Sequence, residues 1–296
     1  IPEQAALFYS ASLLVAPHGS SIANAIFMKP TGIVFELICM DDGSFSNKNR
    51  HNQHINSLSH SKFIEHKKNV GSKANRGRLA TLAQYNWLLF IDADSKPKST
   101  LFLSKYIDMC DRPFDAIFGG FAYDSTLKDP NQSLRHYFGK NREEIQSAKR
   151  NKNPYKVIIS ANFLIRKVVF LNVSKHCNQN TYGLDYLFSS QLKTNNISVF
   201  HIDNEVWHLG LDKNEEFLKK TQNAVKALYT ASKLQMLPAH NISLLKTYNV
   251  IVKLGLKTPL KWFFTKLKSK LERHLFRQEP SLVLFDLYRL GYLCSQ

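Results

Sequence analysis

Residues 86–94 read NWLLFIDAD, an apolar run that ends in two aspartates one residue apart. A short, continuous apolar run is typical of a strand that is buried on both faces. Residues 33–44, IVFELICMDDGS, repeat this arrangement and end in Asp41, Asp42 and a turn. Residues 71–85, between the two runs, have the pattern of a helix. Strand, helix and strand in this order predict a mostly parallel sheet covered by helices on both faces.

The same alternation continues in both directions along the chain. The other expected strands are residues 12–17, 116–123, 157–165 and 197–202, and the other expected helices are 20–28, 99–110, 182–194 and 212–235. From residue 241 to the end the pattern is helical, with breaks expected at Pro259 and Pro280.

Both acidic clusters follow apolar strands, and ligands of such sheets bind beyond the carboxyl ends of the strands. Asp92 and Asp94, one residue apart in Asp92-Ala93-Asp94, can bind a hard divalent cation together or through water. A cation there would neutralise a diphosphate and stabilise it as a leaving group. The alternative is an ordinary acidic turn between a strand and a loop.

The composition predicts a folded, basic protein. The chain has 296 residues, 44% of them hydrophobic, which excludes a mainly disordered chain. Lys plus Arg is 40 and Asp plus Glu is 23, so the formal net charge is +17. Such a charge points to an anionic partner: nucleic acid, anionic lipid, or a phosphorylated or acidic substrate. The four cysteines form no CxxC pair, which argues against a disulfide scaffold or structural zinc and suits a reducing compartment.

The start of the chain and its apolar runs bear on targeting. No apolar run reaches the roughly 18 to 20 residues that cross a bilayer. The chain opens on Ile1 with Glu3 close by and has no basic leader, so we expect no signal peptide. Because the first residue is not Met, we expect a fragment or a trimmed chain.

Three more motifs follow the acidic clusters in order. They are Asn69-Val70-Gly71 with Arg76 and Arg78, then Gly183-Leu184-Asp185, then Val206-Trp207-His208-Leu209-Gly210. Together with Asp41-Asp42-Gly43-Ser44 and Asp92-Ala93-Asp94, this ordered set resembles family 2 glycosyltransferases over roughly residues 33–235. The similarity is to the bacterial surface-polysaccharide branch, including relatives of chondroitin-type polymerases. The ending 284–292, LFDLYRLGY, also resembles that branch.

The resemblance implies an α/β fold of the GT-A type, an αβα sandwich around a mixed, mainly parallel sheet. It implies a catalytic domain at residues 1–238 and a basic, helical C-terminal region at residues 239–296. The implied activity is the inverting transfer of a hexose or hexosamine from a UDP-sugar to a glycan hydroxyl in polysaccharide biosynthesis. Mg²⁺ or Mn²⁺ would be the cofactor, and a glycan or lipid-linked glycan the acceptor.

The resemblance also implies a role for each motif residue. Asp42, beside Asp41, would accept a hydrogen bond from uracil, and Arg76 and Lys73 would face the diphosphate or the donor sugar. Asp92, with Ala93 beside it, would face the ribose or the sugar. The implied metal ligands are Asp94, Asp92 and His208, the implied catalytic base is Asp185, and the implied acceptor contacts are Leu184 and Trp207.

The chemistry of transfer is consistent with one base and one metal. An acceptor hydroxyl loses its proton to a carboxylate as it attacks the anomeric carbon. The transition state resembles an oxocarbenium ion, and a divalent metal can replace the general acid for a UDP leaving group. A single displacement of this kind inverts the anomeric configuration.

Each role has an ordinary structural alternative. Asp185 can simply meet the dipole of its helix, and His208 can be a core histidine beside Trp207. Arg76 and Arg78 can form a solvated helix face. Gly120, after Gly119, can mark a close backbone approach to the donor or a bulge.

Two parts of the sequence depart from the family pattern. Leu184 stands where the family usually has Glu before the catalytic Asp, which puts acceptor binding or rate in doubt. Residues 13–36, with PHG after a strand, are instead similar to family 61 glycosyltransferases, over roughly residues 5–37. Residues 1–37 are therefore either a junction with a family 61 domain or an atypical first βαβ segment. His18 is a weak candidate for a nucleotide contact.

The C-terminal region is strongly basic. Residues 246–277 hold nine Lys or Arg and one acid, Glu272. Six apolar residues recur there at helical spacing: Leu260, Phe263, Phe264, Leu267, Leu271 and Leu275. This stripe can lie on an anionic membrane surface or pack on the rest of the protein. We expect a cytoplasmic enzyme, with the inner face of the bacterial plasma membrane as a candidate surface.

Two other classes of function stay open. Leu184 and the altered first strand leave room for a catalytically impaired module that binds a nucleotide-sugar. The charge alone also fits a basic nucleic-acid-binding protein, although no RNP, helix-turn-helix or zinc-finger pattern supports it.

Overall fold

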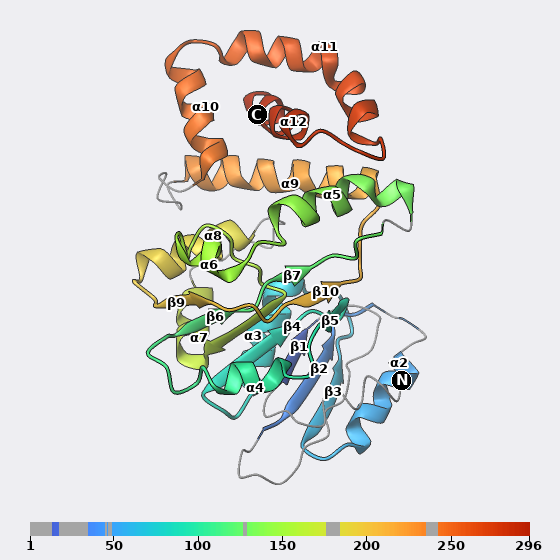
Figure 1. Cartoon of the computed structure of the whole chain (residues 1–296), viewed down its shortest axis with the longest axis vertical. Helices are drawn as coiled ribbons and strands as arrows, with labels where there is room; N and C mark the ends of the chain where they lie inside the picture. The colour runs from blue at the N-terminus through green and yellow to red at the C-terminus, as the bar shows by residue number, and fades with distance from the viewer. Residues whose placement is uncertain are drawn as a thin grey trace. The chain divides into compact units, whose positions relative to one another are not determined.

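The structure is a computed structural model that describes residues 14–17, 35–44, 46, 49–126, 129–175, 184–234 and 242–296 (Figure 1). The chain divides into two compact units. The first comprises Ile1–Ala122, Ile145–Asn180 and Gln191–Gly210, and the second comprises Tyr123–Glu144, Thr181–Ser190 and Leu211–Gln296. Each unit is thus assembled from three separate stretches of the chain. The expected helix 20–28 and His18 lie outside the described residues.

The first unit is built on a seven-stranded sheet in the order β3-β2-β1-β4-β8-β6-β9. Its strands are β1 (Leu14–Pro17), β2 (Leu37–Asp41), β3 (Ser61–Glu65), β4 (Trp87–Ile91), β6 (Ala116–Phe118), β8 (Asn162–Arg166) and β9 (Val199–His201). Of these described strands, β8 alone runs antiparallel to its neighbours. The prediction of a mixed, mainly parallel sheet is confirmed.

β1 lies inside this sheet, paired in parallel with both β2 and β4. Its position is the one that a first βαβ segment requires, because it separates the two strands that end in the acidic clusters. Asp41 is the last residue of β2, and Asp92 follows β4 directly. Both clusters therefore lie at the same edge of the sheet.

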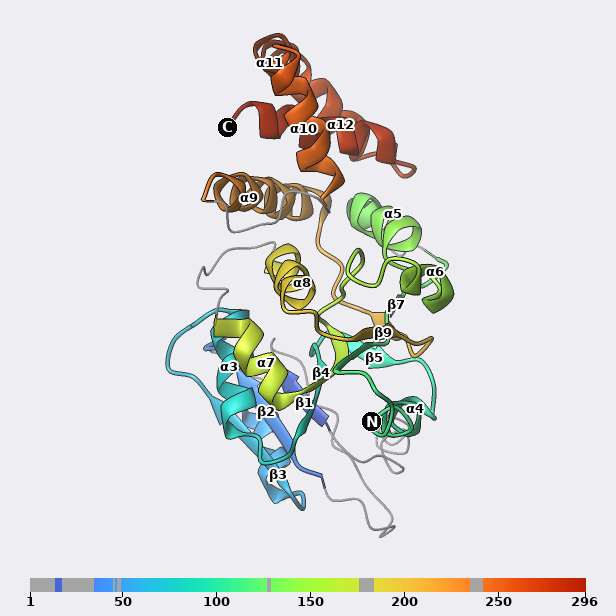
Figure 2. The ribbon, with the colours of Figure 1, turned by 90° about the vertical axis from the view of Figure 1, so that its left-hand side faces the viewer.

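Helices cover both faces of the sheet (Figure 2). α3 (Ser72–Leu82) and α7 (Lys167–Lys175) lie on one face, and α4 (Phe102–Ile107) lies on the other. α2 (Asn49–Asn52) and a 3₁₀ turn (Gln53–Ser57) lead into β3, and α6 (Ser147–Asn151) precedes β8. Helices α3 and α4 were predicted, whereas α6, α7 and β3 were not, because short or polar segments carry little periodicity.

Phenylalanines of three strands and of α7 form the centre of the core of the first unit. Phe90 of β4 is opposite Phe163 of β8, and Phe163 is opposite Phe118 of β6. Their rings stack with centroids 5.0 and 5.3 Å apart, and Phe170 of α7 lies 4.7 Å from Phe90. Stacked aromatic pairs add roughly 0.5–1.5 kcal/mol each beyond their buried area. The continuous apolar runs seen in the sequence therefore reflect strands buried on both faces.

A second sheet has three strands, in the order β5-β10-β7, and they alternate along the chain with strands of the large sheet. Its strands are β5 (Ser95–Pro97), β7 (Phe121–Ala122) and β10 (Val206–His208). Each continues a strand of the large sheet after a short connection: β4 leads to β5, β6 to β7 and β9 to β10. The expected single strand 116–123 is thus two strands, divided at Gly119 and Gly120. We call these three connections the seam between the sheets.

Two buried polar side chains hold the seam together. The guanidinium of Arg150, on α6, donates to the carbonyls of Phe118, Gly119 and Ile202 at 3.1, 3.2 and 2.8 Å. The Asn162 amide donates to the carbonyls of Gly120 (2.9 Å) and Asn204 (2.8 Å). Each side chain thereby joins the connection after β6 to the connection after β9.

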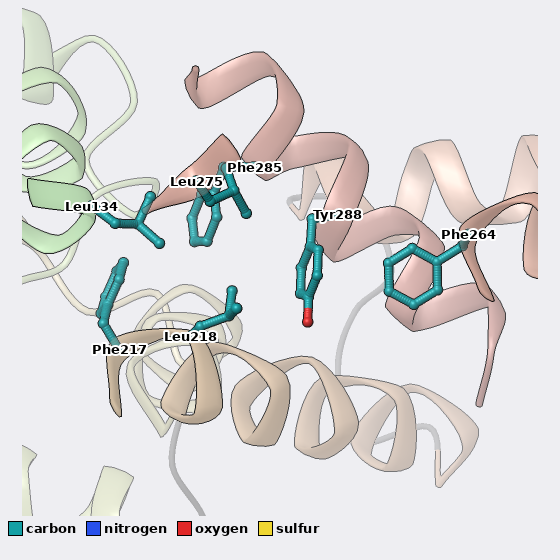
Figure 3. Close-up of a cluster of buried hydrophobic side chains, with 7 residues drawn as sticks. All are labelled: Leu134, Phe217, Leu218, Phe264, Leu275, Phe285 and Tyr288. Carbon is teal, nitrogen blue, oxygen red and sulfur yellow. The ribbon is translucent and has the colours of Figure 1, made fainter. Parts of the chain in front are cut away.

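The second unit is helical. Its helices are α5 (Ser133–Arg142), α9 (Asn214–Lys233), α10 (Ser243–Lys253), α11 (Lys257–Leu275) and α12 (Leu282–Cys294), with a 3₁₀ turn at Pro130–Gln132. α8 (Leu184–Thr194) begins in this unit and ends in the first. Figure 3 shows the core, to which α5, α9, α11 and α12 contribute Leu134, Phe217, Leu218, Phe264, Leu275, Phe285 and Tyr288. α9, which the sequence analysis assigned to the catalytic domain, belongs to this helical unit.

The prediction of a break at Pro259 was wrong, because this residue lies within α11. Pro259 occupies the first turn of α11, where its missing N–H leaves no bond unmade. The chain breaks instead at Gly255, whose φ is +71°. The break expected at Pro280 is confirmed, since α12 begins at Leu282. Among the described helices, none has both the length and the apolar character needed to cross a membrane.

The turn after β2 depends on a glycine. Gly43 has a φ of +66°, and a Cβ placed there would lie 2.4 Å from the carbonyl carbon of Lys68 and 2.6 Å from the Asn69 nitrogen. Both are backbone atoms that cannot move aside cheaply. The turn therefore packs closely against the loop that leads into α3.

Gly43→Ala is expected to destabilise the first unit by at least about 2 kcal/mol, from the left-handed backbone penalty plus the clash with Lys68. Gly77→Ala, on α3, is the matched control because a Cβ there meets nothing within 4 Å. It should raise stability by about 0.5–1 kcal/mol through helix propensity. Urea unfolding measures both, and a Gly43→Ala change below 0.5 kcal/mol would contradict the close packing.

His201 makes the first unit sensitive to acid. Its Nδ1 lies 2.8 Å from Arg150 Nη1, and its Nε2 lies 2.7 Å from the carbonyl of Pro154. Since guanidinium only donates and a carbonyl only accepts, the neutral imidazole carries its proton on Nε2. Burial, with the Arg150 charge adding to it, lowers the pKa of His201 to about 4. Protonation would place a second hydrogen against Arg150.

The lowered pKa of His201 predicts a loss of stability on acidification. The unfolded chain, with a His pKa near 6.5, binds this proton first, so stability falls as the pH drops from about 6.5 to about 4. The full effect is on the order of 3 kcal/mol. His201→Gln should be less stable at pH 7.5 but lose less on acidification, while exposed His54→Gln keeps the wild-type profile. Parallel profiles for His201→Gln and wild type would contradict this.

Candidate active site

The acidic pair at the end of β2 is buried among loops. Asp41, 2% exposed, accepts hydrogen bonds from the amide and the hydroxyl of Ser44 at 2.8 and 2.6 Å. Asp42, 1% exposed, accepts from the amides of Val70 and Gly71 at 2.7 and 2.9 Å. Gly71 is the N-cap of α3, so Asp42 also lies at the positive end of that helix dipole. Asp42 thus fixes the loop that leads into α3.

α3 brings Arg76 to the Asp92–Asp94 cluster. Arg76 Nη2 donates to Asp92 Oδ1 at 2.6 Å, and Arg76 Nη1 donates to Ser160 Oγ at 3.3 Å. Within the part of the chain that the structure describes, Arg76 Nε is buried without a hydrogen-bond partner. Lys73 lies one turn earlier on the same helix and is half-buried. The helix therefore places the guanidinium of Arg76 beside the first carboxylate of the cluster.

Asp94 and His208 come together because β5 pairs with β10. The antiparallel register places His208 opposite Ser95, the residue after Asp94. Asp94 Oδ2 lies 3.5 Å from His208 Nε2, and the amide of Leu209 donates to the carbonyl of Asp94 at 2.8 Å. A Cβ on Gly210 would lie 2.3 Å from Asp94 Oδ2, so the glycine leaves room for this carboxylate.

The His208 ring packs against an aromatic ring of a neighbouring strand. It stacks on Phe121 of β7, with ring centroids 4.7 Å apart and an angle of 12° between the planes. The register places Phe121 opposite Val206, two residues before His208, so the two rings lie on the same face of the small sheet. Phe121 and Ser160 are site residues that the sequence motifs do not predict. For Phe121 a signal existed in its place directly after Gly119 and Gly120, whereas for Ser160 there was none.

The remaining donor-side residues have varied surroundings. Gly120 is buried with a φ of +90°, and a Cβ there would lie 2.8 Å from Arg150 Nη2. A close approach within the seam therefore accounts for this glycine. Ala93 is half-buried between the two aspartates, and Trp207, also half-buried, has Lys98 Nζ 5.4 Å from its ring centre.

Asp94 and His208 lie close enough together to hold one divalent ion between them. Two ligands each about 2.1 Å from one ion lie roughly 3 Å apart at a right angle and further apart at wider angles. The 3.5 Å between Asp94 and His208 is within that reach. In the described residues no group of three or more His, Cys, Asp or Glu side chains could hold a metal, and Asp92 is paired with Arg76. The other ligands would have to come from substrate oxygens and water, as Mg²⁺ commonly allows.

Asp185 belongs to the second unit, whereas the Asp92–Asp94 cluster and His208 belong to the first. It lies exposed in the first turn of α8, where a carboxylate meets the positive end of the helix. The next residue, Tyr186, accepts a hydrogen bond at its hydroxyl from Arg289 Nη2 of α12 at 3.1 Å. Gly183 and the side chain of Leu184 lie outside the described residues.

Asp286 links α12 to α5. Its carboxylate pairs with Arg142 Nη2 of α5 at 2.9 Å and, within α12, with Arg289 Nη1 at 3.3 Å. Asp286 and Arg289 both lie in the stretch 284–292 that was singled out in the sequence. That stretch therefore connects α5, α12 and the first turn of α8.

Two known protein families match parts of this chain. The family described as Glycosyl transferase family 2 matches residues 20–173, more than half of the chain. The family described as Glycosyltransferase 61 matches residues 1–35. No curated protein matches the chain at a significant level. Both resemblances noted in the sequence are thus confirmed.

Matches among solved structures include two of TarS from S. aureus. The crystal structure of its fragment 1–349 shares 13% identity, with a TM-score of 0.48, and the match covers 96% of this chain and 90% of that one. A second crystal structure of TarS shares 13% identity, with a TM-score of 0.44, over 74% of this chain and 40% of that one. The family match, together with the mixed sheet, identifies an α/β fold of the GT-A type with a helical C-terminal region, and the chain belongs to glycosyl transferase family 2.

Proposed function

We propose that this chain transfers a hexose or hexosamine from a UDP-sugar to a glycan hydroxyl, with inversion, in bacterial polysaccharide biosynthesis. The observation that carries the proposal is the pairing of Asp94 with His208, 3.5 Å apart, next to the Arg76–Asp92 ion pair. A carboxylate and an imidazole at this separation can share one Mg²⁺ or Mn²⁺ ion. When bound, the ion supplies positive charge that stabilises the diphosphate as it leaves.

The donor is held by the residues around this pair. Arg76 and Lys73 lie on the donor side of α3, and the buried Nε of Arg76 offers one more donor to a phosphate oxygen after a small shift of the side chain. Asp92, already bonded to Arg76, contacts the ribose or the sugar. Asp42 and the loop it fixes, together with Asp41, form the uracil side of the site.

The transfer itself needs one base. The carboxylate of Asp185 takes the proton of the acceptor hydroxyl while that oxygen attacks the anomeric carbon. The bond from the anomeric carbon to the diphosphate breaks with its electron pair on UDP. One displacement from the opposite side inverts the anomeric centre, and Leu184 and Trp207 are the acceptor contacts. A glycan or lipid-linked glycan is the acceptor.

The test is the release of UDP from UDP-sugars in the presence of Mn²⁺. Asp94→Ala, His208→Ala and Asp185→Asn should each lower turnover by about a hundredfold or more, because each removes a group that acts on the reacting atoms. Chelation should abolish turnover, and added Mn²⁺ should restore it. Asp94→Ala and His208→Ala should also weaken Mn²⁺ binding, whereas Asp185→Asn should not.

The matched controls are exposed residues of the same types. Asp111→Asn and His54→Ala should keep wild-type turnover, and thermal unfolding should show that all variants fold. UDP binding without any turnover in wild type would favour the impaired module instead. Tight, salt-sensitive oligonucleotide binding that Asp94→Ala leaves unchanged would favour the nucleic-acid-binding alternative.

Arg289 is a positioning residue in this proposal, because it reaches α8 through Tyr186 and not through the base itself. Removal of the bond should loosen the first turn of α8 and so disorder Asp185. Arg289→Ala and Tyr186→Phe are each expected to lower kcat about tenfold, with the donor KM within twofold of wild type.

A double-mutant cycle separates this role from a general loss of stability. The Arg289→Ala/Tyr186→Phe variant should be no slower than Arg289→Ala alone, because Arg289→Ala already removes the bond that Tyr186→Phe removes. Arg277→Ala, an exposed arginine of the same unit, should leave kcat unchanged. Additive losses in the double variant would show that the bond has no part in catalysis.

A further inference from the structure

Six apolar side chains lie exposed between the end of α10 and the second turn of α11. They are Val250, Val252, Leu254, Leu256, Trp262 and Phe263, each 43% to 65% exposed. Scattered exposed apolar residues are normal on a protein surface, but six within fourteen residues are not. We call these residues, with the lysines between and after them, the α10–α11 surface.

The predicted apolar stripe of the C-terminal region divides between this surface and the helical core: Phe263 is exposed, whereas other members of the stripe are packed inside. Phe264 and Leu275 are buried in the helical core and Leu271 packs against it, as Figure 3 shows for the first two. For these three residues, packing within the protein is the observed alternative. The exposed aromatics Trp262 and Phe263 therefore need a separate explanation.

α11 has two faces of different chemistry. At 100° per residue, Phe264, Leu271 and Leu275 lie on one side of the helix, and Trp262 lies on the opposite side. Lys266 and Arg273 share the side of Trp262, and Lys270 lies near Phe263. All three cations are exposed. The outer face of α11 thus combines aromatic rings with cations.

The surrounding charge has one sign. Residues 217–271 contain eleven lysines and no Asp or Glu. Exposed Lys246, Lys253 and Lys261 lie along the same stretch as the apolar side chains. A surface of this kind attracts an anionic partner over the range of a Debye length.

A rigid turn presents the aliphatic residues. The amide of Leu256 donates to the carbonyl of Ile251 at 3.0 Å, and the amide of Gly255 donates to that of Val252 at 3.1 Å. These two bonds, with the left-handed Gly255, form a Schellman motif that ends α10. Leu254 and Leu256 are therefore held outward by the backbone, 65% and 47% exposed.

We propose that the α10–α11 surface binds an anionic lipid bilayer. The lysines meet the headgroups while Trp262, Phe263 and the aliphatic residues enter the boundary with the acyl chains. Aromatic rings and lysines alone would also suit a single-stranded nucleic acid. Four of the six apolar side chains are aliphatic, however, and these gain little from nucleotide bases but much from acyl chains. The proposal is independent of the sugar transfer proposed above.

The test is sedimentation of the full chain with vesicles, without a sugar donor. Wild type should bind vesicles containing phosphatidylglycerol, bind neutral phosphatidylcholine vesicles at least tenfold more weakly, and dissociate in high salt. Trp262→Ala/Phe263→Ala should weaken binding about tenfold or more. Lys266→Glu/Lys270→Glu should weaken it by more than fivefold per residue, since each lysine contributes about that factor near an anionic surface.

Matched variants elsewhere exclude general effects. Leu101→Ala/Val168→Ala removes exposed apolar surface from the first unit, and Lys149→Glu/Lys152→Glu makes the same change in net charge on and after α6. Both should bind vesicles like wild type. Lipids brominated in the acyl chain should quench tryptophan fluorescence in wild type and not in Trp262→Phe.

Three results would overturn the proposal. The first is equal binding to neutral and anionic vesicles, or no effect of the Trp262→Ala/Phe263→Ala variant. The second is a dimer in sedimentation velocity that this variant abolishes, which would assign the surface to a second copy of the chain. The third is an oligonucleotide that binds more tightly than the vesicles and displaces the protein from them.

Discussion

The buried guanidinium of Arg150 is the constraint on which the first unit depends. It is 2% exposed and donates to four backbone carbonyls, and its Nη1 also lies 2.8 Å from His201 Nδ1. A buried cation costs several kcal/mol unless hydrogen bonds and a counter-charge offset that cost. Carbonyls supply most of the compensation here, and Asp203 Oδ1 lies 3.9 Å away. Loss of the bonds would therefore leave the two sheets free to separate where they meet.

The geometry of the candidate site follows from that seam. His208 lies at the end of β10 and Asp94 lies just before β5, so the two meet only if the small sheet forms. Asn162 and Arg150 fix the backbone just before β7 and β10, and the ring of Phe121 then supports His208. The distance between Asp94 and His208 is thus a property of the sheet pairing, not of local sequence. For this reason the local sequence around either residue does not by itself indicate a metal ligand.

The sequence predicted the large sheet well and the small one poorly. Apolar runs such as 86–91 stand out because both faces of their strands are buried. β5, β7 and β10 have two or three residues each, too few for any period, and β8 gives no sign that it runs antiparallel. The carboxylates could be located because they end long strands. The ion pair of Asp92 with Arg76 and the support from Phe121 depend on tertiary contacts that no spacing reveals.

The protein uses its positive charge in two ways. Some cations have short, specific partners, as in the Arg76–Asp92 and Arg166–Asp115 pairs of the first unit and the Arg142–Asp286 pair of the second. The lysines of residues 217–271 have no acid within that stretch, so any counter-charge comes from outside it. Short, partly buried pairs are screened weakly by salt, whereas exposed charges facing a surface are screened strongly. Ionic strength therefore separates the two sources of the +17 charge: the donor binding proposed at Arg76 should persist at salt concentrations that release the α10–α11 surface from an anionic partner.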